Sequence, residues 1–238
     1  MIRLPDNIKN NPVFNSAAFI YPTYITLACI FMAELNIVHA RFLLNIELTY
    51  TAFIMPTFAG VMFGYLLARI KLLGDQLKIV AYTDSLTNIY NRLHFTRLLD
   101  AEIDKIKRYG GNLSVITFDI DHFKQINDSH GHPTGDMILK EIAKVIASAN
   151  RSSDIFARYG GEEFIILTVS TNAEGAMGHA QRLRQDVEQH RFTIGRVTAS
   201  FGVTGFDPCS DDRESLLERA DKAMYQAKAD GRNCVRQL

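Results

Sequence analysis

Two long apolar stretches near the N-terminus constrain the fold of this chain more than any other feature. Residues 14–35 and 48–67 are rich in aliphatic and aromatic side chains and carry almost no charge. A helix needs roughly 20 such residues to cross a bilayer. Pro22 and Pro56 lie within them, and membrane helices tolerate proline because neighbouring groups satisfy the freed carbonyls. We therefore expect a hairpin of two transmembrane helices within residues 1–69.

The basic side chains around these stretches predict their orientation. Before the first stretch and after the second lie Arg3, Lys9, Arg69, Lys71 and Lys78. The short connection, roughly residues 36–47, has only Arg41 and His39. Since lysine and arginine tend to stay on the cytoplasmic side, we expect a multi-pass membrane protein with both ends in the cytoplasm.

Two other interpretations of these stretches remain open. The first stretch could be a cleaved signal peptide, although it is long for an apolar signal core and a second stretch follows it. Both stretches could instead be buried helices of a soluble protein, although neither shows a polar face at a 3.6-residue period.

Residues 70–82 predict a helical linker. Ile70, Leu73, Leu77 and Val80 follow a 3-4-3 apolar spacing with polar residues between them. This pattern is typical of a short parallel coiled coil, and equally of an amphipathic helix packed on its own domain. The sequence does not separate these two alternatives.

Charge and cysteine content argue against two classes of protein. The chain has 26 basic and 26 acidic side chains, so nothing indicates a general attraction to nucleic acid. Cys29, Cys209 and Cys234 are far apart and lack metal-ligand spacing. They fit a reducing compartment and argue against a disulfide framework.

Residues 83–238 have the pattern of an α/β domain, because helical apolar stretches alternate with short β-rich runs. We predict a helix over 91–109, a strand over 113–120, a polar helix from about His122 and a turn around 131–135. The strand carries Asp119 near its end and Asp121 follows it. Acids at the end of a strand are candidate metal ligands.

A second pair of acids lies in a predicted β-hairpin. Residues 156–159 and 162–167 read as two strands joined by Gly160 and Gly161, which permit a sharp turn and the close approach of a phosphate. Glu162 and Glu163 lie at the tip. Neighbouring side chains of a strand point to opposite faces, so only one of these carboxylates can face a metal.

Several ordered motifs between residues 82 and 238 together point to one family. They are Asp84-Ser85-Leu86-Thr87, Asn91-Arg92, Phe118-Asp119-Ile120-Asp121-His122-Phe123-Lys124, Asn127-Asp128, Gly131-His132, Gly135-Asp136, Arg158-Tyr159-Gly160-Gly161-Glu162-Glu163-Phe164, Ser200-Phe201-Gly202-Val203, Ala220-Asp221-Lys222-Ala223-Met224-Tyr225, Lys228 and Gly231-Arg232-Asn233. This set resembles the GGDEF domain of diguanylate cyclases, in its GGEEF form. Asn88 stands where that family often has glycine, but asparagine tolerates left-handed backbone geometry.

The resemblance implies a palm-like α/β fold with a central, mostly antiparallel sheet flanked by helices. It implies a Mg²⁺-dependent enzyme, with Mn²⁺ as an alternative metal, that condenses two GTP into cyclic di-GMP and two pyrophosphates. Each domain holds one GTP, so the enzyme should be a homodimer. Location in a bacterial inner membrane, with the catalytic domain in the cytoplasm, is also expected. The main alternative is a catalytically silent receptor for GTP or cyclic di-GMP, and a second is an adenylate cyclase of related architecture.

The resemblance also implies roles for individual residues near the metal. Asp119, the main-chain carbonyl of Ile120 and Glu162 would hold Mg²⁺, since hard oxygen ligands suit it. Glu162 would also accept the proton of the attacking hydroxyl, and Glu163 would help to place a second ion. Lys124 would offset phosphate charge. For Asp121 we favour capping of the following helix over metal ligation.

The remaining implied site residues bind nucleotide. The substrate set comprises Phe123, Asn127, His132, Asp136, Gly160, Gly161, Lys228 and Arg232. Asp136 would accept from the guanine edge, with Asn127 as its amide partner and His132 near the ribose or base. Lys228 and Arg232 lie four apart, on one helix face if the helix continues, and would reach the same anion.

Simpler structural roles compete with some of these assignments. Asn127, Gly131 and Gly135 could be ordinary turn residues, and Lys228 and Arg232 a solvated helix face. Arg151 and Asp154 form an RxxD motif at the spacing of the family's inhibitory product site, whereas a surface ion pair is the usual meaning of such a motif.

Overall fold

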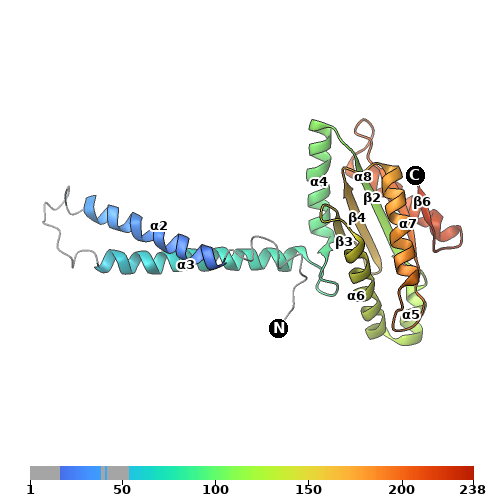
Figure 1. The fold of residues 1–238 in the computed structure, drawn as a ribbon, viewed down its shortest axis with the longest axis horizontal. Helices are drawn as coiled ribbons and strands as arrows, with labels where there is room; N and C mark the ends of the chain where they lie inside the picture. The colour runs from blue at the N-terminus through green and yellow to red at the C-terminus, as the bar shows by residue number, and fades with distance from the viewer. Residues whose placement is uncertain (1–16, 39–40, 42–53) are drawn as a thin grey trace. The chain divides into compact units, whose positions relative to one another are not determined.

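The computed structural model describes residues 17–38, 41 and 54–238. The chain divides into two compact units, Met1–Ala81 and Tyr82–Leu238, and each is described by itself. Figure 1 shows the helices and strands of both units.

The described part of the N-terminal unit comprises helices α2 (Ala17–Val38) and α3 (Ile54–Tyr82). Within α3, Thr57–Gly74 is long and apolar enough to cross a membrane, with a mean hydropathy of 1.3. The described apolar part of α2, Tyr21–Leu35, is too short to meet the same length requirement for crossing a membrane. Arg3, Lys9 and parts of both predicted spans, residues 14–16 and 48–53, lie outside the described residues.

Close backbone packing joins α2 to α3. A Cβ atom at Gly64 would lie 2.6 Å from the Ile25 Cα, and one at Gly60 would lie 2.9 Å from the Cys29 Cα. Ala68, four residues further along α3, is fully buried. Small residues spaced by four let two helices approach closely, which is a common way for membrane helices to associate.

The predicted linker is the C-terminal part of α3, because this helix continues without interruption to Tyr82. Ile70 and Leu73 are 58% and 49% exposed within the chain. These two side chains therefore form an exposed apolar surface on the part of α3 that the structure describes. The side chains of Leu77 and Val80 lie outside the described residues.

The C-terminal unit is built on a six-stranded sheet with the order β1-β3-β4-β2-β5-β6. The strands are β1 (Tyr90–Asn91), β2 (Leu113–Ile120), β3 (Ile155–Arg158), β4 (Glu163–Val169), β5 (Ala199–Gly205) and β6 (Val235–Gln237). The central pairs are antiparallel, and β1 and β6 add parallel pairs at the edges. The sheet is therefore mixed and mostly antiparallel.

Five helices flank this sheet (Figure 1). They are α4 (Arg92–Tyr109), α5 (Phe123–His130), α6 (His132–Ala149), α7 (Ala173–Gln189) and α8 (Arg213–Ala229). One core cluster joins α6 and α7 to the sheet, and a second joins α4 and α8 to it. Helices thus cover both faces of the sheet.

Strand β2 is buried along its whole length, which explains why its sequence is a continuous apolar run. Its side chains alternate, with Phe118 in the α6–α7 cluster and Val115 in the α4–α8 cluster. Phe118 stacks on Phe164 of β4 and Phe201 of β5, with ring centroids 5.1 and 4.7 Å apart. This row of rings fixes the three central strands against one another.

Most of the elements predicted from the sequence agree with the structure. Helix α4 begins at Arg92 because the Asn91 side chain caps it, accepting from the His94 N–H. Asn88 adopts the left-handed backbone expected of it, with φ 59°. The predicted turn over 131–135 is wrong. Gly131, with φ 81°, is the single residue between α5 and α6, and α6 begins at His132.

Gly202 of β5 sets the distance between the sheet and α8. A Cβ atom there would lie 2.3 Å from both the Ala220 carbonyl oxygen and the Met224 nitrogen. These are main-chain atoms of a helix, so they cannot move aside without shifting α8.

We therefore expect Gly202→Ala to lower the free energy of unfolding by about 1–3 kcal/mol, because the added methyl overpacks a backbone contact. The matched control is Gly178→Ala in α7, where the nearest atom to an added Cβ is 4.0 Å away. That exchange should stay within about 1 kcal/mol of wild type, on the stabilising side. Urea unfolding followed by circular dichroism compares the two, and equal stabilities would contradict the packing argument.

Candidate functional site

A cavity of about 280 Å³ lies at the C-terminal end of β2. The end of β2, the start of α5, the approach to β4 and the end of α8 converge there. The sequence-predicted residues that line it are Asp119, Ile120, Phe123, Lys124, Glu162, Lys228 and Arg232. Two acids, the main chain of Ile120 and three cations thus meet around one cavity, although they come from distant parts of the sequence.

Asp119 is the buried acid of this cavity, with 5% of its surface exposed. In the sheet it pairs with Glu163 on one side and Ser200 on the other. The Lys228 Nζ lies 3.0 Å from its Oδ2. Burial raises the pKa of Asp119 to about 6, an effect that Lys228 opposes and the charges of Glu162 and Glu163 reinforce. The site therefore favours an additional cation.

Glu162 and Glu163 diverge, although the predicted strand over 162–167 begins one residue later: β4 starts at Glu163, and Glu162 lies in the bend before it, so strand alternation does not apply to the pair. Glu162 lines the cavity, and burial raises the pKa of its carboxyl, with Lys228 opposing this and Glu163 adding to it. The Glu163 carboxylate lies against Gly160, where an added Cβ would be 2.6 Å from its Oε2. Gly161 has open space around its Cα instead. Of the two glutamates, only Glu162 therefore lines the cavity together with Asp119.

The cavity offers few acidic side chains as ligands for a metal ion. Across residues 17–38, 41 and 54–238, no three His, Cys, Asp or Glu side chains cluster closely enough to hold a metal by themselves. The expected set has only two carboxylates, and its third ligand is the main chain of Ile120, which also lines the cavity. Their mutual repulsion and burial are what a divalent cation would relieve.

Asp121 has a different task from the one expected. The N-cap of α5 is His122, with left-handed φ 59° and no side-chain cap bond, so the capping prediction for Asp121 is wrong. Its carboxylate accepts from Thr198 Oγ1 at 2.7 Å and from Ser200 Oγ at 2.6 Å. It also accepts from the Asn233 N–H at 3.0 Å. Asp121 thus ties β2 to β5 and to the turn after α8.

The three cations that line the cavity come from two places in the chain, the start of α5 and the region around the end of α8. Lys124 is in the first turn of α5, and Lys228 is in the last turn of α8. The idea that Lys228 and Arg232 share a helix face is wrong, because α8 ends at Ala229 and Arg232 lies in a left-handed turn with φ 66°. Both nevertheless line the same cavity, so a purely solvated role does not describe them.

Arg158 holds the glycine turn of the β3–β4 hairpin. Its guanidinium donates to the Gly161 carbonyl at 2.6 Å and forms an ion pair with Asp84 at 3.1 Å. Asp84 in turn accepts from the N–H and hydroxyl of Thr87. The sequence predicts no individual role for Arg158 or Asp84. The one indication is that each belongs to a family motif, and these two motifs are far apart in the chain.

The residues expected to read guanine gather at the corner between α5 and α6. Asn127 Oδ1 lies so close to Gly135 that an added Cβ would be 1.9 Å away. His132 and Asp136 lie in the first turns of α6 and are exposed. Gly131 and Gly135 are therefore needed for this corner, which is adjacent in the chain to the cavity rather than part of its lining.

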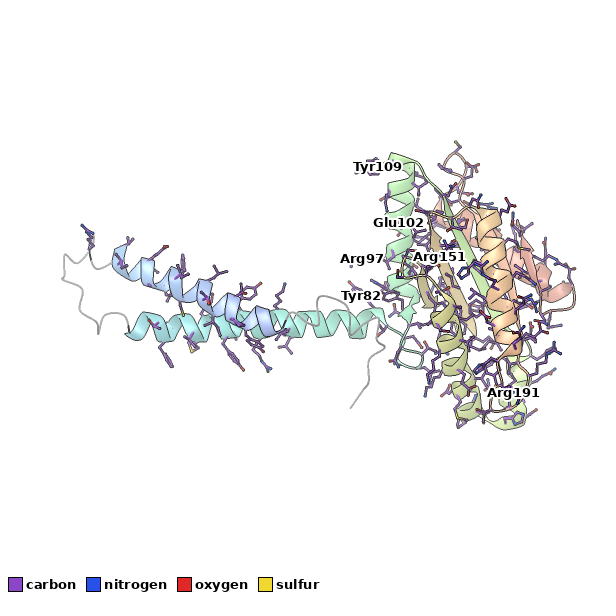
Figure 2. The ribbon with its side chains drawn as sticks, in the orientation of Figure 1. Tyr82, Arg97, Glu102, Tyr109, Arg151 and Arg191 are labelled. Carbon is purple, nitrogen blue, oxygen red and sulfur yellow. The ribbon has the colours of Figure 1, made fainter. Side chains whose placement is uncertain are left out.

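The RxxD motif lies in the connection from α6 to β3. Asp154 accepts from the Arg151 main-chain N–H at 3.3 Å and from the Ser153 hydroxyl at 3.4 Å. In the part of the chain that the structure describes, no acid pairs with the exposed Arg151 guanidinium, which is labelled in Figure 2. A simple surface ion pair therefore does not account for this motif.

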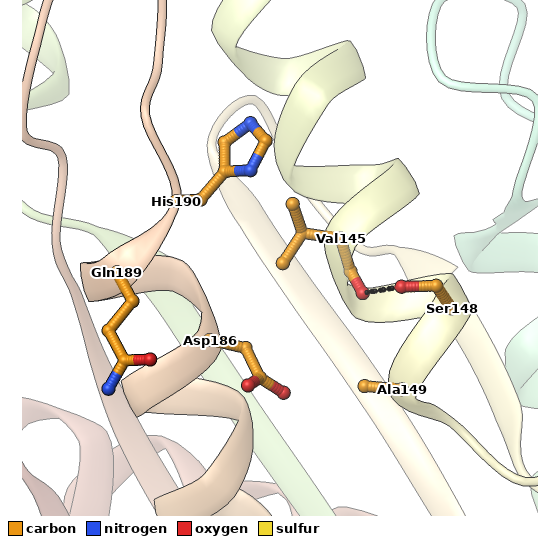
Figure 3. A pocket seen from close by; sticks show the side chains of 6 residues that line it. All are labelled: Val145, Ser148, Ala149, Asp186, Gln189 and His190. Atoms are coloured by element: carbon orange, nitrogen blue, oxygen red, sulfur yellow. Dashed lines mark hydrogen bonds between the residues drawn. The ribbon is translucent and has the colours of Figure 1, made fainter.

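A second, larger cavity of about 430 Å³ lies between the C-terminal parts of α6 and α7 (Figure 3). It is lined by Val145, Ser148, Ala149, Asp186, Gln189 and His190. None of the predicted site residues lines it, and its two titratable side chains are not joined by a described hydrogen bond. We therefore assign the chemistry to the smaller cavity, where buried acids and cations converge.

Comparison with known proteins agrees with this geometry. The family model described as diguanylate cyclase, GGDEF domain, matches residues 81–234. Diguanylate cyclase A of Treponema denticola is 40% identical over 176 residues, which cover 71% of this chain and 47% of that protein. Response regulator PleD of Caulobacter vibrioides is 43% identical over 162 residues, covering 66% and 36%. The chain thus spans less than half the length of either relative.

Solved structures show the same fold. The coiled coil and GGDEF domain of DgcB from Caulobacter crescentus, in complex with c-di-GMP, matches with a TM-score of 0.68 and 32% identity. The match covers 72% of this chain and 93% of that one. The family model matches more than half of the chain, and this chain belongs to the GGDEF domain family.

Proposed function

We propose that this chain is a diguanylate cyclase that condenses two GTP into cyclic di-GMP with the help of Mg²⁺. The observation that carries the proposal is the convergence of Asp119 and Glu162 with the cations Lys124, Lys228 and Arg232 around one cavity. Two acids and three cations fit a metal–triphosphate complex, in which the metal needs oxygen ligands and the phosphates need positive charge.

The residues present suit a divalent cation bound between Asp119, the Ile120 carbonyl and Glu162. When bound, the cation neutralises triphosphate charge and makes the α-phosphorus more open to attack. In each half of the reaction, a ribose 3′ oxygen bonds to the α-phosphorus of the other nucleotide and displaces pyrophosphate. Glu162 accepts the proton that this hydroxyl loses, and its raised pKa suits that task. Glu163 helps to place a second ion.

The cations and the α5–α6 corner supply binding and selectivity. Lys124, Lys228 and Arg232 offset the phosphate charge, and Gly161, which has open space around its Cα, leaves room for the phosphates, while Gly160 permits the turn beside it. Asp136 accepts from guanine N1–H and its exocyclic amine, which adenine cannot match. Asn127, His132 and Phe123 complete the nucleotide site. This set favours guanine over adenine and hence a diguanylate cyclase over an adenylate cyclase.

Joining two nucleotides requires two domains face to face, so the active form is a homodimer. The exposed Ile70 and Leu73 on the C-terminal part of α3 support pairing of two such helices. The DgcB structure, which includes a coiled coil beside its GGDEF domain, is consistent with this arrangement. Anchoring in a bacterial inner membrane by α2 and α3 would raise the local concentration of the partners.

Product inhibition is the regulatory part of the proposal. Asp154 is held by main-chain and hydroxyl bonds, and the nearby Arg151 guanidinium is exposed, so both can meet a ligand. Arginine pairs with phosphate or stacks on guanine, and aspartate accepts from the guanine edge. Two solved structures of one relative, DgcB from Caulobacter crescentus, are complexes with c-di-GMP, which supports binding of the product by this fold.

Glu162→Gln tests the central claim, because it removes one metal-binding charge and the proton acceptor together. We expect the rate of cyclic di-GMP formation from GTP to fall by at least about 100-fold. The matched control is Glu218→Gln, an exposed residue of α8 paired with Lys222. The chain is purified in detergent with Mg²⁺, and its product is measured by chromatography. Equal rates for Glu162→Gln and wild type would refute the assignment, and an inactive wild type that binds GTP would favour the receptor alternative.

Arg151→Ala tests product inhibition. The concentration of added cyclic di-GMP that halves the initial rate should rise at least about tenfold, because a charge-assisted contact to the product is lost. Arg191→Ala serves as control, since Arg191 is another exposed arginine, far along the chain from the motif (Figure 2). If both variants are inhibited like the wild type, Arg151 does not bind the product.

Membrane attachment and orientation are tested together. We expect the chain to remain in the membrane fraction after an alkaline wash and to dissolve only in detergent. With Cys29 and Cys234 replaced by serine, the exposed Cys209 should react with a membrane-impermeant thiol reagent only after the cells are permeabilised. Release by the wash would contradict the anchor, and labelling of intact cells would contradict a cytoplasmic domain.

A further inference from the structure

The turn that follows α8 has an unusual backbone. Gly231, Arg232 and Asn233 have φ angles of 107°, 66° and 45° in succession. Residues other than glycine rarely adopt this left-handed backbone conformation, and they keep it only where the surrounding structure holds them. This turn also brings Arg232 to the cavity. The contacts that hold the turn therefore determine where the Arg232 guanidinium lies.

Asn233 provides most of these contacts. Its main-chain N–H donates to Asp121 Oδ2 at 3.0 Å. Its side-chain Nδ2 donates to Glu188 Oε1 at 2.9 Å, and its Oδ1 accepts from Arg184 Nη1 at 2.8 Å. Both ends of the side-chain amide are thus bonded to residues of α7 that do not line the cavity.

Glu188 is itself fixed by two arginines. Arg184 Nη1 donates to its Oε2 at 2.6 Å, and Arg196 donates to its Oε1. Hydrogen bonds from Arg184, Asn233 and Arg196 lower the pKa of Glu188 to about 2, so the carboxylate is ionised whenever the enzyme works. Arg184 is buried, with 9% of its surface exposed. Glu188 and Arg184 therefore form a rigid acceptor and donor pair for Asn233.

We propose that Glu188, with Arg184, is a positioning residue for Arg232, acting through Asn233 on the turn that presents this arginine to the triphosphate. Neither Glu188 nor Arg184 lines the cavity. The docking of α7 does not depend on Glu188, because Leu183 and Val187 of that helix are buried in the core. The inference rests on the proposed function, since it assigns the triphosphate of GTP to Arg232.

The measurement is the affinity of the purified chain, in detergent with Mg²⁺, for 3′-deoxy-GTP, which lacks the attacking hydroxyl. We expect Glu188→Ala to weaken binding on the order of tenfold, since affinity falls with the fraction of molecules whose turn is correctly formed. With GTP itself, KM should rise more than kcat falls. Glu218→Ala removes an exposed helical glutamate with an ion-pair partner and should bind like the wild type.

A double-mutant cycle distinguishes positioning from a general loss of structure. If Glu188 acts through Arg232, Glu188→Ala should cause no further loss in an Arg232→Ala background. An equal loss in both backgrounds would overturn the proposal. Asn233→Gly covers the case in which Glu188→Ala does not fold, because glycine tolerates the backbone while removing both side-chain bonds. Wild-type affinity in Asn233→Gly would also overturn it.

The same titration separates this inference from the proposed function. A wild type that binds 3′-deoxy-GTP but makes no cyclic di-GMP contradicts the cyclase activity, whereas the comparison of variants still reports on the turn. A wild type that makes cyclic di-GMP, with Glu188→Ala binding as tightly, contradicts only the positioning role.

Discussion

The register of β2 between β4 and β5 is the constraint on which the site depends. Asp119 stands opposite Glu163 on one side and Ser200 on the other, while the Phe118 ring stacks on Phe164 and Phe201. Strand side chains alternate, so a slip of one residue would turn Phe118 away from the α6–α7 core and Asp119 into it. The buried row of aromatic rings therefore helps to fix the position of Asp119, the acid that we propose as a metal ligand.

Side chains outside the proposed ligand set hold the site in place, and one of them, Asp121, also lines the cavity. Arg158 ties the Gly161 carbonyl to Asp84, and thereby holds the turn that precedes Glu162. On the other side, Asp121 bonds to both β5 and the turn after α8. These ionised groups are half-buried or buried and fully hydrogen-bonded, the condition under which buried polar contacts specify one geometry. Pre-organisation of this kind is what phosphoryl transfer requires of a protein.

The N-terminal unit, Met1–Ala81, packs two helices together and leaves apolar side chains exposed. In the first unit, α2 and α3 pack through Gly60 and Gly64, so the small residues of α3 are already occupied by its own partner helix. The C-terminal part of α3 leaves Ile70 and Leu73 exposed. This exposed linker face is the surface that we propose for pairing with a second copy. Under the proposed function, a change in linker pairing would alter how two GTP-loaded domains meet.

The sequence by itself determined the local features. Apolar periodicity and turn chemistry were enough for α4, β2 and the glycine hairpin, because these depend on neighbours in the chain. The ordered motifs singled out Asp119, Glu162 and Lys228 by resemblance, and the fold brings these three to one cavity. Only the tertiary structure decided what Asp121, Arg158 and Glu188 do. Their partners lie 77, 74 and 45 residues away, in Thr198, Asp84 and Asn233. A hydrogen bond across such separations depends on sheet order and helix docking, which no local pattern records.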